Sequence, residues 1–460
     1  MNPSSEPILA LITPAGYAAI SVIRLSGKGC IELVAKHIKN SGRLLKSPTH
    51  RLIHTTICSD SGQAIDDVLL SVFRAPHSYT GEDSVEISCH GNPNLVNRIM
   101  QILLQQCRMA KPGEFTLRAY LSGKLDLSQA EAVNDLICAQ ASKAENAALM
   151  QLHGYLSQYL SEILQRITDA RLRCELAIDF ADQDLPQIDL DALSESVSGI
   201  IRDAGELESK GQQGRIIREG IKICLAGAPN SGKSSLFNAL LQNNRAIVTP
   251  HPGTTRDYLE ESISLSGFPV IIYDTAGLRE SDHEIESLGI AQSYILMQQA
   301  DLILYLLDSS EFDNQQSENH TEQDFLSQTT LPTDLWEKTI LVFSKADLSP
   351  KPYKHSLCGI YCSVKEINGL KTLSETILKR MLLSDDLLHK PLITNARHLA
   401  ALQKCISSLT EAKNSLDRGQ GFEFTAFELI SASNALEEIL GVISTDDLLE
   451  QIFSNFCIGK

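Results

Sequence analysis

The chain has 460 residues, 43% of them hydrophobic, which suffices for about three domains of ~150 residues with cores of their own. Every apolar run falls short of the ~18 residues of a membrane-spanning helix, and the start, Met1-Asn2-Pro3-Ser4-Ser5-Glu6, lacks the basic segment of a signal peptide. Eleven cysteines form no Cys-x-x-Cys pair. These features exclude a membrane protein, a disulfide framework and a zinc site, and they predict a cytoplasmic protein.

The net charge of -17 is unevenly spread. Residues 1–124 hold 13 Lys and Arg against 9 Asp and Glu, whereas the remainder holds 27 against 48. An anionic ligand is therefore better received by the amino-terminal part, although an excess of four cations is also what an ordinary surface carries. A protein this acidic is not expected to grip nucleic acid strongly unaided.

Residues 1–122 predict an α+β domain, because β-rich stretches at 18–25 and 67–73 alternate with turns and a helical segment near 93–106. A capping box at Ser128-Gln129-Ala130-Glu131 then predicts the start of a long helical segment. One of its faces is apolar at alternating spacings of four and three: Leu156, Leu160, Ile163, Ile167, Ala170, Cys174 and Ala177. The stripe favours packing inside a bundle of the same chain, with a coiled coil between chains as the alternative.

Strands alternate with helices from 215 to 380, which predicts a doubly wound α/β domain. Helical patterns occupy 123–214 before it and 381–460 after it, so the simplest architecture inserts the α/β domain into an all-α helical domain. Gly211-Gln212-Gln213-Gly214 predicts a hinge between the two. A polar stretch near 311–334 predicts a solvated loop.

Residues 227–234 read G-A-P-N-S-G-K-S, the complete pattern of a phosphate-binding loop. An apolar run at 221–226 predicts a buried strand before it, and the residues from Ser234 onward open a helix. In such a loop backbone N–H groups cradle phosphates, Lys233 reaches them and Ser234 can ligand magnesium. The pattern predicts binding of a nucleoside triphosphate.

Two further motifs indicate the base. Asp274-Thr275-Ala276-Gly277 ends an apolar run, where Asp274 can hold magnesium through water and the Gly277 N–H can sense the γ-phosphate. Ser344-Lys345-Ala346-Asp347 follows the strand predicted at 339–343. Asp347 can accept two hydrogen bonds from the guanine edge, and Lys345 can lie along its ring. The order of these motifs favours guanine over adenine.

The chain resembles the translation-factor-like GTPases in these motifs. Gly253-Thr254-Thr255-Arg256-Asp257 lies between the first two, where a Thr that senses the γ-phosphate belongs. Leu278 follows Gly277, at the position where Ras-type enzymes carry a water-orienting Gln. A leucine cannot align a nucleophile, so the catalytic residue is expected elsewhere.

The last four residues, Cys457-Ile458-Gly459-Lys460, narrow the resemblance. Together with the sequences at 80–86, 111–115 and 123–127, they resemble the MnmE (TrmE) family of bacterial tRNA modification GTPases over essentially the whole chain. The resemblance implies a homodimer that modifies C5 of the wobble uridine of tRNA with a carboxymethylaminomethyl or aminomethyl group. It also implies a formyl or methylene tetrahydrofolate donor, and a flavoprotein partner, MnmG (GidA), joined in a heterotetramer.

The resemblance assigns folate contacts to Arg24, Glu86 and Lys124, with Lys460 nearby. Taken alone, Arg24 and Glu86 would be interpreted as a solvated strand pair and Lys124 as a loop charge, and the family match reverses this interpretation. Cys457 matches a thiol close to the folate site, a candidate nucleophile or redox group whose pKa Lys460 could help to lower. The alternatives are an idle thiol on a frayed tail and a lipidation signal, which Gly459 and Lys460 disfavour.

In the nucleotide domain the resemblance implies potassium in place of an arginine finger, because a cation against the phosphates offsets the charge that develops during transfer. Its potassium ligands map to Asn230, Thr249, His251 and Thr254, and its magnesium ligands to Ser234 and Thr255. Glu286 matches a glutamate that orients water indirectly, and Arg279 lies in the same segment. The GTP-binding residues are then Asn230, Ser231, Gly232, Lys233, Ser234, Ser235, Thr249, Pro250, His251, Pro252, Gly253, Thr254, Thr255, Asp274, Thr275, Ala276, Gly277, Ser344, Lys345, Ala346, Asp347 and Ser363.

Three positions depart from the family pattern. Ser344 stands where Asn or Thr is usual, which predicts weaker guanine affinity with specificity kept by Asp347. The loop Thr249-Pro250-His251-Pro252 is stiffer than is usual in the family, which argues against potassium dependence. The usual Ser-Ala is Ser363-Val364 here. Two other functions stay open: a GTPase of ribosome assembly or signalling that only binds RNA or protein, and a folate enzyme with a regulatory nucleotide domain.

Overall fold

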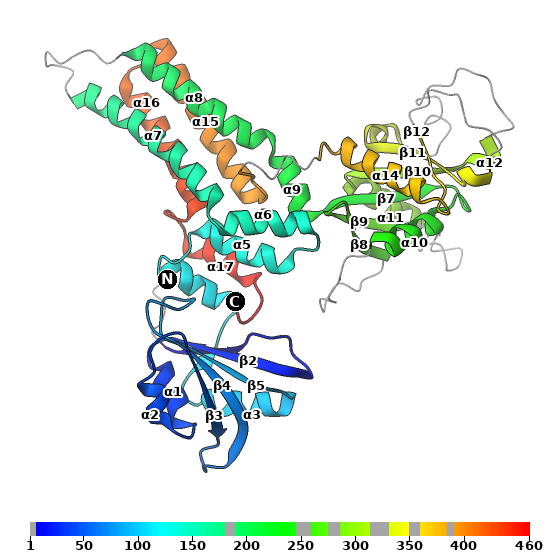
Figure 1. The fold of residues 1–460 in the computed structure, drawn as a ribbon. Coiled ribbons are helices and arrows are strands. Elements are labelled where there is room, and N and C mark those ends of the chain that lie inside the picture. Colours follow the sequence, from blue (N-terminus) through cyan, green and yellow to red (C-terminus); the bar gives the residue numbers. More distant parts are fainter. Residues whose placement is uncertain are drawn as a thin grey trace. The chain divides into compact units, whose positions relative to one another are not determined.

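The computed structural model describes residues 6–179, 189–244, 259–274, 286–312, 331–348, 359–383 and 391–460. The chain divides into two compact units, each made of separate stretches of sequence (Figure 1). Unit 1 comprises residues 1–134, 151–188 and 414–460, and unit 2 comprises residues 135–150 and 189–413. The four domain boundaries given from the sequence stay predictions, because a compact unit can contain parts of more than one domain.

A six-stranded sheet forms the amino-terminal part of unit 1, in the spatial order β3-β4-β5-β2-β1-β6. Neighbouring strands are antiparallel except β1 and β6, which are parallel. The strands are β1 (Ile8–Leu11), β2 (Ala18–Ser26), β3 (Arg51–Cys58), β4 (Ala64–Phe73), β5 (Ser84–Gly91) and β6 (Arg108–Met109). Helices α1 (Cys30–Lys36), α2 (Ser41–Leu45) and α3 (Pro93–Leu103) bury their apolar residues in the same core as the sheet.

The two faces of this sheet differ. Ile23, Leu70 and Ile87 point to the core beneath the three helices and are fully buried. Arg24 alternates with Ile23 along β2 and so lies on the opposite face, where its register partner on β5 is Glu86. The predicted α+β character of this part of the chain is confirmed, including strands at 18–25 and 67–73.

Helices make up the rest of unit 1. They are α4 (Glu114–Leu121), the first part of α5 (Leu127–Cys138), α7 (Tyr155–Asp179), α16 (Phe422–Leu440) and α17 (Asp446–Ser454). Helix α7 carries the apolar stripe expected from sequence, buried from Leu156 to Cys174, and it packs against α16 (Figure 1). The apolar stripe therefore packs inside a bundle of the same chain, as predicted, because helix α16 from the far end of the sequence covers it.

The helix start predicted at Ser128 is wrong by two residues. Asp126 makes the reciprocal bonds of a capping box: its carboxylate accepts the Gln129 N–H at 2.9 Å, and the Gln129 amide oxygen accepts the Asp126 N–H at 3.0 Å. Ser128 lies inside α5 and is fully buried. The sequence offered both patterns, since Asp and Gln serve these two positions as well as Ser and Glu do, and the structure uses Asp126 and Gln129.

Unit 2 contains a second six-stranded sheet, in the order β12-β11-β10-β7-β9-β8. Neighbouring strands of this sheet are parallel, except β8 and β9, which are antiparallel. The strands are β7 (Ile221–Gly227), β8 (Leu259–Leu265), β9 (Phe268–Asp274), β10 (Leu302–Asp308), β11 (Thr339–Ser344) and β12 (Gly359–Tyr361). Its helices are α6 (Ser142–Leu152, to residue 150), α8 (Leu190–Ser209), α9 (Gly211–Glu219), α10 (Lys233–Asn244), α11 (Glu286–Gln299), α12 (Ser309–Phe312), α14 (Ile367–Arg380) and most of α15 (Ala396–Arg418).

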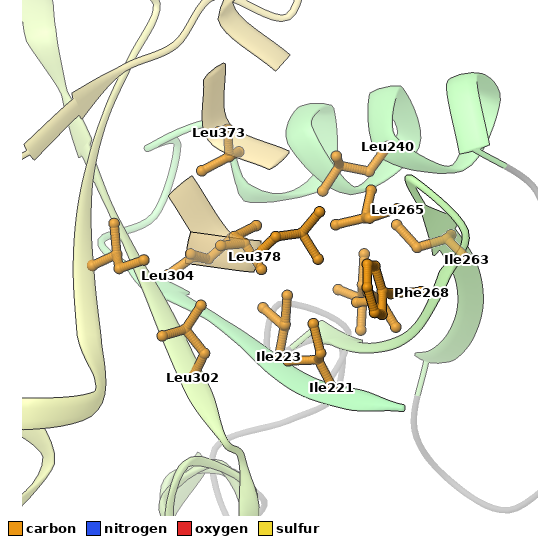
Figure 2. Close-up of a cluster of buried hydrophobic side chains, with 14 of the residues drawn as sticks. Ile221, Ile223, Leu240, Ile263, Leu265, Phe268, Leu302, Leu304, Leu373 and Leu378 are labelled. Carbon is orange, nitrogen blue, oxygen red and sulfur yellow. The ribbon is translucent and has the colours of Figure 1, made fainter. Parts of the chain in front are cut away.

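The sheet of unit 2 buries a hydrophobic cluster on each face: one is drawn in Figure 2, and the other contains Cys224, Ile303 and Leu341. Side chains of the central strands, such as Ile223 and Leu304, meet Leu240 of α10 and Leu373 of α14 in the first cluster, and all four are essentially excluded from water. A doubly wound α/β domain with helical segments before and after it in sequence is therefore present, as predicted.

The hinge expected at residues 211–214 is instead the first turn of helix α9. A Cβ at Gly214 would collide with the carbonyl oxygen of Ile393, and one at Gly211 would come within 2.5 Å of a Leu399 methyl group. The two glycines thus allow close packing of α9 and do not supply flexibility. Two glycines three residues apart cannot be told from a hinge by composition alone.

Candidate functional site

The phosphate-binding loop lies between β7 and α10, in the strand-loop-helix setting expected for it. Gly227 has a φ of 137°, and a Cβ there would collide with the carbonyl oxygen of Leu306 on the neighbouring strand. Asn230, although not a glycine, adopts the left-handed region with a φ of 63°. Lys233 curls back along the loop, where its ammonium donates to the carbonyls of Gly227 at 3.0 Å and Ala228 at 2.7 Å.

A cavity of about 210 Å³ opens beside this loop. It is lined by five predicted GTP-binding residues, Gly232, Ser235, Ser344, Lys345 and Asp347, together with Leu236, Leu306, Val342, Leu348, Cys362, Val364 and Lys365. Parallel strands β10, β11 and β12 all end at this edge of the sheet. Topology therefore gathers motifs that are more than 100 residues apart in sequence.

Two neighbouring side chains hold Asp347 in place as a hydrogen-bond acceptor. Its carboxylate accepts the Ser363 hydroxyl at 2.8 Å and pairs with the Lys365 ammonium at 2.7 Å. The hydrogen bond from Lys365, followed by the one from Ser363, holds the pKa of Asp347 below its ordinary value. The group stays a carboxylate at neutral pH, as an acceptor for the N–H groups of a guanine edge must be.

Ser344 has a structural role that the motif comparison did not reveal. Its hydroxyl is buried and lies 2.6 Å from the Ser231 carbonyl and 3.1 Å from the Leu307 carbonyl, to which it donates. The base-recognition strand is thereby connected to the phosphate-binding loop. The expectation that Ser344 weakens guanine affinity stays a prediction.

A second group of predicted residues meets in unit 1. The Arg24 guanidinium donates to Glu86 across strands β2 and β5, at 2.9 and 2.8 Å, and lies over the rings of Tyr79 and Phe115, with its centre 5.3 and 5.6 Å from theirs. Its third nitrogen, Nη1, is buried and has no hydrogen-bond partner among the described residues. Lys460 lies beside this pair: burial first, and the Arg24 charge second, hold the pKa of its ammonium below the ordinary value.

The carboxyl-terminal residues reach this site along β1 and α4. Gly459 has a φ of 101°, and a Cβ there would lie 2.9 Å from the Leu11 carbonyl oxygen. The Gly113 N–H donates to the Cys457 carbonyl at 3.5 Å, and the Cys457 side chain is exposed. Lys124 instead donates to the Pro76 carbonyl at 3.1 Å. The structure brings Arg24, Glu86 and Lys460 together, and places Lys124 on a neighbouring loop.

Comparisons with known proteins identify the family. The model of the MnmE helical domain matches residues 127–457, and that of the GTP-binding protein TrmE N-terminus matches residues 7–124. The tRNA modification GTPase MnmE of Aquifex aeolicus is 39% identical over 463 residues, covering 99% of this chain and 100% of the relative. That of Moorella thermoacetica is 40% identical over 474 residues, covering 99% of each. The chain belongs to the MnmE (TrmE) family of tRNA modification GTPases.

Membership of the MnmE family makes the chain a GTP-hydrolysing enzyme of tRNA modification. The G domain of the T. maritima FeoB iron transporter is a solved structure with local similarity, at 29% identity over 35% of this chain and 98% of that one, with a TM-score of 0.23. Magnesium fits the hard oxygen donors in unit 2: Ser234 at the start of α10 and Asp274, 4% exposed, at the end of β9. Among the described residues, no helix is both long and apolar enough to cross a membrane.

Much of the predicted catalytic machinery lies outside the described residues. This holds for Arg279 and Leu278 and for the following GTP-binding and metal-binding positions: Thr249, Pro250, His251, Pro252, Gly253, Thr254, Thr255, Thr275, Ala276 and Gly277. Glu286 is the first residue of α11, and its side chain is likewise outside the described part. Their roles stay predictions.

Two further residues that pair with the base-recognition motif were missed from sequence. Asp308 ends β10 and pairs with the Lys345 ammonium at 2.5 Å, while its other oxygen accepts the N–H and hydroxyl of Ser310. Lys365 pairs with Asp347. The signal for Asp308 was present, because a carboxylate directly after a buried apolar run is the same pattern that singled out Asp274.

Proposed function

We propose that this MnmE-family chain takes part in C5 modification of the wobble uridine of tRNA, with a formyl or methylene tetrahydrofolate bound at Arg24, Glu86 and Lys460. The observation that carries the proposal is the convergence of these residues with Cys457. Residues 24 and 460 lie at opposite ends of the sequence, and yet Gly459 packs against Leu11 of β1, and Arg24 and Glu86 act on the pKa of the Lys460 ammonium. Because the substrate is tRNA, we place the protein in the cytoplasm.

The chemistry of the group suits a folate. Glu86 offers carboxylate oxygens to the N–H groups of a pterin ring, and Arg24 Nη1 is a donor without a protein partner in the described part of the chain. The ammonium of Lys460 adds positive charge, which favours the glutamate tail of the donor. The rings of Tyr79 and Phe115 lie against the Arg24 guanidinium and restrict its orientation.

Cys457 is proposed as a functional thiol of the same site, as a nucleophile or redox group. Its side chain is exposed, and its backbone is bound to Gly113 and to the N–H of Lys460. These contacts favour a positioned thiol over a frayed tail, because both neighbours are part of the packed structure. The two chemical roles are separate hypotheses.

A homodimer is proposed from the open face of the amino-terminal sheet. On the face that carries Arg24 and Glu86, Ile20, Leu52 and Leu69 are 58, 60 and 39% exposed. Apolar side chains grouped on an uncovered sheet face favour association with another chain. A heterotetramer with the flavoprotein MnmG is proposed from family membership alone.

Hydrolysis is proposed to depend on potassium, with Asn230 among its ligands and Glu286 orienting the attacking water indirectly. The left-handed backbone of Asn230 supports the first part, because strain of this kind is kept where the surroundings enforce a particular side-chain direction. GTP hydrolysis would then pace the chemistry of unit 1. Equal hydrolysis rates in potassium and sodium would remove the potassium site from this proposal.

Calorimetry with 5-formyltetrahydrofolate tests the proposed donor site. We expect the wild-type protein to bind and the Arg24→Ala variant to bind at least tenfold more weakly, since a charge-assisted contact is worth about 1.5–3 kcal/mol. Arg173→Ala removes an exposed arginine of helix α7 and serves as the control. Equal affinities of all three proteins would overturn the site.

A further inference from the structure

The positive charge of the amino-terminal domain is concentrated in one short stretch. Residues 28–51 contain six Lys or Arg, namely Lys28, Lys36, Lys39, Arg43, Lys46 and Arg51, and a single carboxylate, Glu32. The rest of the chain holds 34 Lys and Arg against 56 Asp and Glu. We refer to the six cations as the basic surface.

All six side chains of the basic surface are exposed. Lys36 donates to the amide oxygen of Gln106, and the other five have no carboxylate partner among the residues that the structure describes. By contrast, Arg24, Arg108 and Arg118 of the same domain each pair with a glutamate. Six of the ten cations of residues 1–124 that have no carboxylate partner among the described residues are therefore on this surface.

The basic surface lies on the α1–α2 layer and the start of edge strand β3. Helices α1 and α2 bury Val34 and Leu44 against the sheet, so their charged residues lie on the outer side of the layer. Arg24 and Glu86 occupy the other face of the sheet. The basic surface is thus separated from the candidate donor site by the thickness of the domain.

The backbone beneath these cations is fixed. The Lys39 N–H donates to the Thr56 carbonyl at 3.0 Å, and its carbonyl accepts the Thr55 hydroxyl at 2.7 Å. Arg74 holds the end of α2 by donating to the carbonyls of Leu45 and Ser47, at 2.7 and 2.8 Å. A row of unpaired cations on a rigid backbone is what binding to successive phosphates requires.

We propose that the basic surface of helices α1 and α2 binds the phosphate backbone of the tRNA substrate. The inference rests on tRNA as the substrate but not on the folate donor. Phosphate contacts from lysine and arginine give affinity and orientation without reading sequence. The carboxylate excess of the remaining chain repels a polyanion, so it directs the tRNA to this surface.

The test is a salt titration of tRNA binding by the full-length protein. The triple variant Lys39→Glu, Arg43→Glu, Lys46→Glu is compared with the control Arg173→Glu, Lys404→Glu, Arg418→Glu, which changes net charge equally at exposed positions of α7 and α15. An unmodified tRNA transcript is the probe. We expect the triple variant to bind 10–100-fold more weakly, with a slope of log affinity against log salt reduced by about three, one for each lost phosphate contact.

The neutral triple variant Lys39→Gln, Arg43→Gln, Lys46→Gln separates charge from misfolding. It is expected to fold as the wild type does, to hydrolyse GTP at an unchanged basal rate and to show the same reduction of about three in the slope of log tRNA affinity against log salt. Unchanged tRNA affinity, or an equal loss in the control, would overturn the proposal. So would normal tRNA affinity combined with lost modification in cells, which would assign the surface to a protein partner. Failure of the wild-type protein to bind 5-formyltetrahydrofolate, together with the expected loss of tRNA affinity in the triple variant, would count against the donor site alone.

Discussion

The two candidate sites differ in how the chain assembles them. The base cavity of unit 2 is built at the carboxyl ends of neighbouring parallel strands, so each contributing residue directly follows a strand that can be recognised in the sequence. The site of unit 1 joins an antiparallel strand pair to the last residues of the chain. Parallel topology makes a site readable from local motifs, whereas a site built by register and by a docked tail leaves no such motif, and family resemblance alone indicated it in the sequence.

The largest effect is expected in the base cavity, from Asp347→Asn. An amide offers the guanine edge one acceptor and adds a donor that faces the donors of the base, so two charge-assisted hydrogen bonds are lost. At about 1.5–3 kcal/mol each, GTP affinity falls by about a hundredfold or more. Fluorescent-nucleotide titration measures it. Asp191→Asn, at an exposed position of α8, is the control.

The second prediction concerns stability beside the unit 1 site. Glu114 is buried, which raises its pKa, but hydrogen bonds from Arg108, the Lys111 N–H and Arg118 outweigh burial and lower the pKa to about 2. The stabilisation is therefore present above the unfolded pKa, 4.5, and is lost as pH falls toward 2. The free energy of unfolding in urea should be about 3 kcal/mol higher for the wild type than for Glu114→Gln at pH 7, and the difference should be much smaller at pH 3. A difference independent of pH would show that the glutamate acts by packing.

The third prediction tests the docked tail. Gly459→Ala places a methyl group against the Leu11 carbonyl in a left-handed backbone, which displaces Lys460 from Arg24. We expect folate affinity to fall about tenfold, the loss of one contact of about 1.4 kcal/mol. Gly419→Ala also has a positive φ, 62°, but open space around it, so it controls for backbone strain. Equal affinities in the two variants would place Lys460 outside the site.

The smallest effect is expected for Asp308→Asn. This carboxylate pairs with the ammonium of Lys345, whose backbone has a φ of 54°, and so positions Lys345 at the base cavity. We expect the KM for GTP to rise about fivefold, roughly 1 kcal/mol, with kcat unchanged. Asp308→Glu should restore part of the affinity. A fall in kcat would instead connect Asp308 to the catalytic step.

The sequence predicted the α/β domain, the strand-loop-helix around Lys233 and the position of Asp347, because each depends on a local pattern. It could not predict that Ser344 bonds to the phosphate-binding loop, since that contact spans 113 residues. The glycines at 211 and 214 were misinterpreted for a similar reason: their role depends on Ile393 and Leu399, which are far away in sequence. The placement of Lys460 beside Arg24 followed from family resemblance and not from any spacing.

Mass analysis of tRNA nucleosides tests most directly whether the two sites serve one reaction. The host is a strain that lacks its own family member and is complemented with wild type, Asp347→Asn or Arg24→Ala. We predict that the wild-type chain restores the C5 modification of the wobble uridine, and that neither variant does so although both are produced at normal levels. Full modification with either variant would show that its site is dispensable and would contradict the coupling of GTP hydrolysis to one-carbon chemistry.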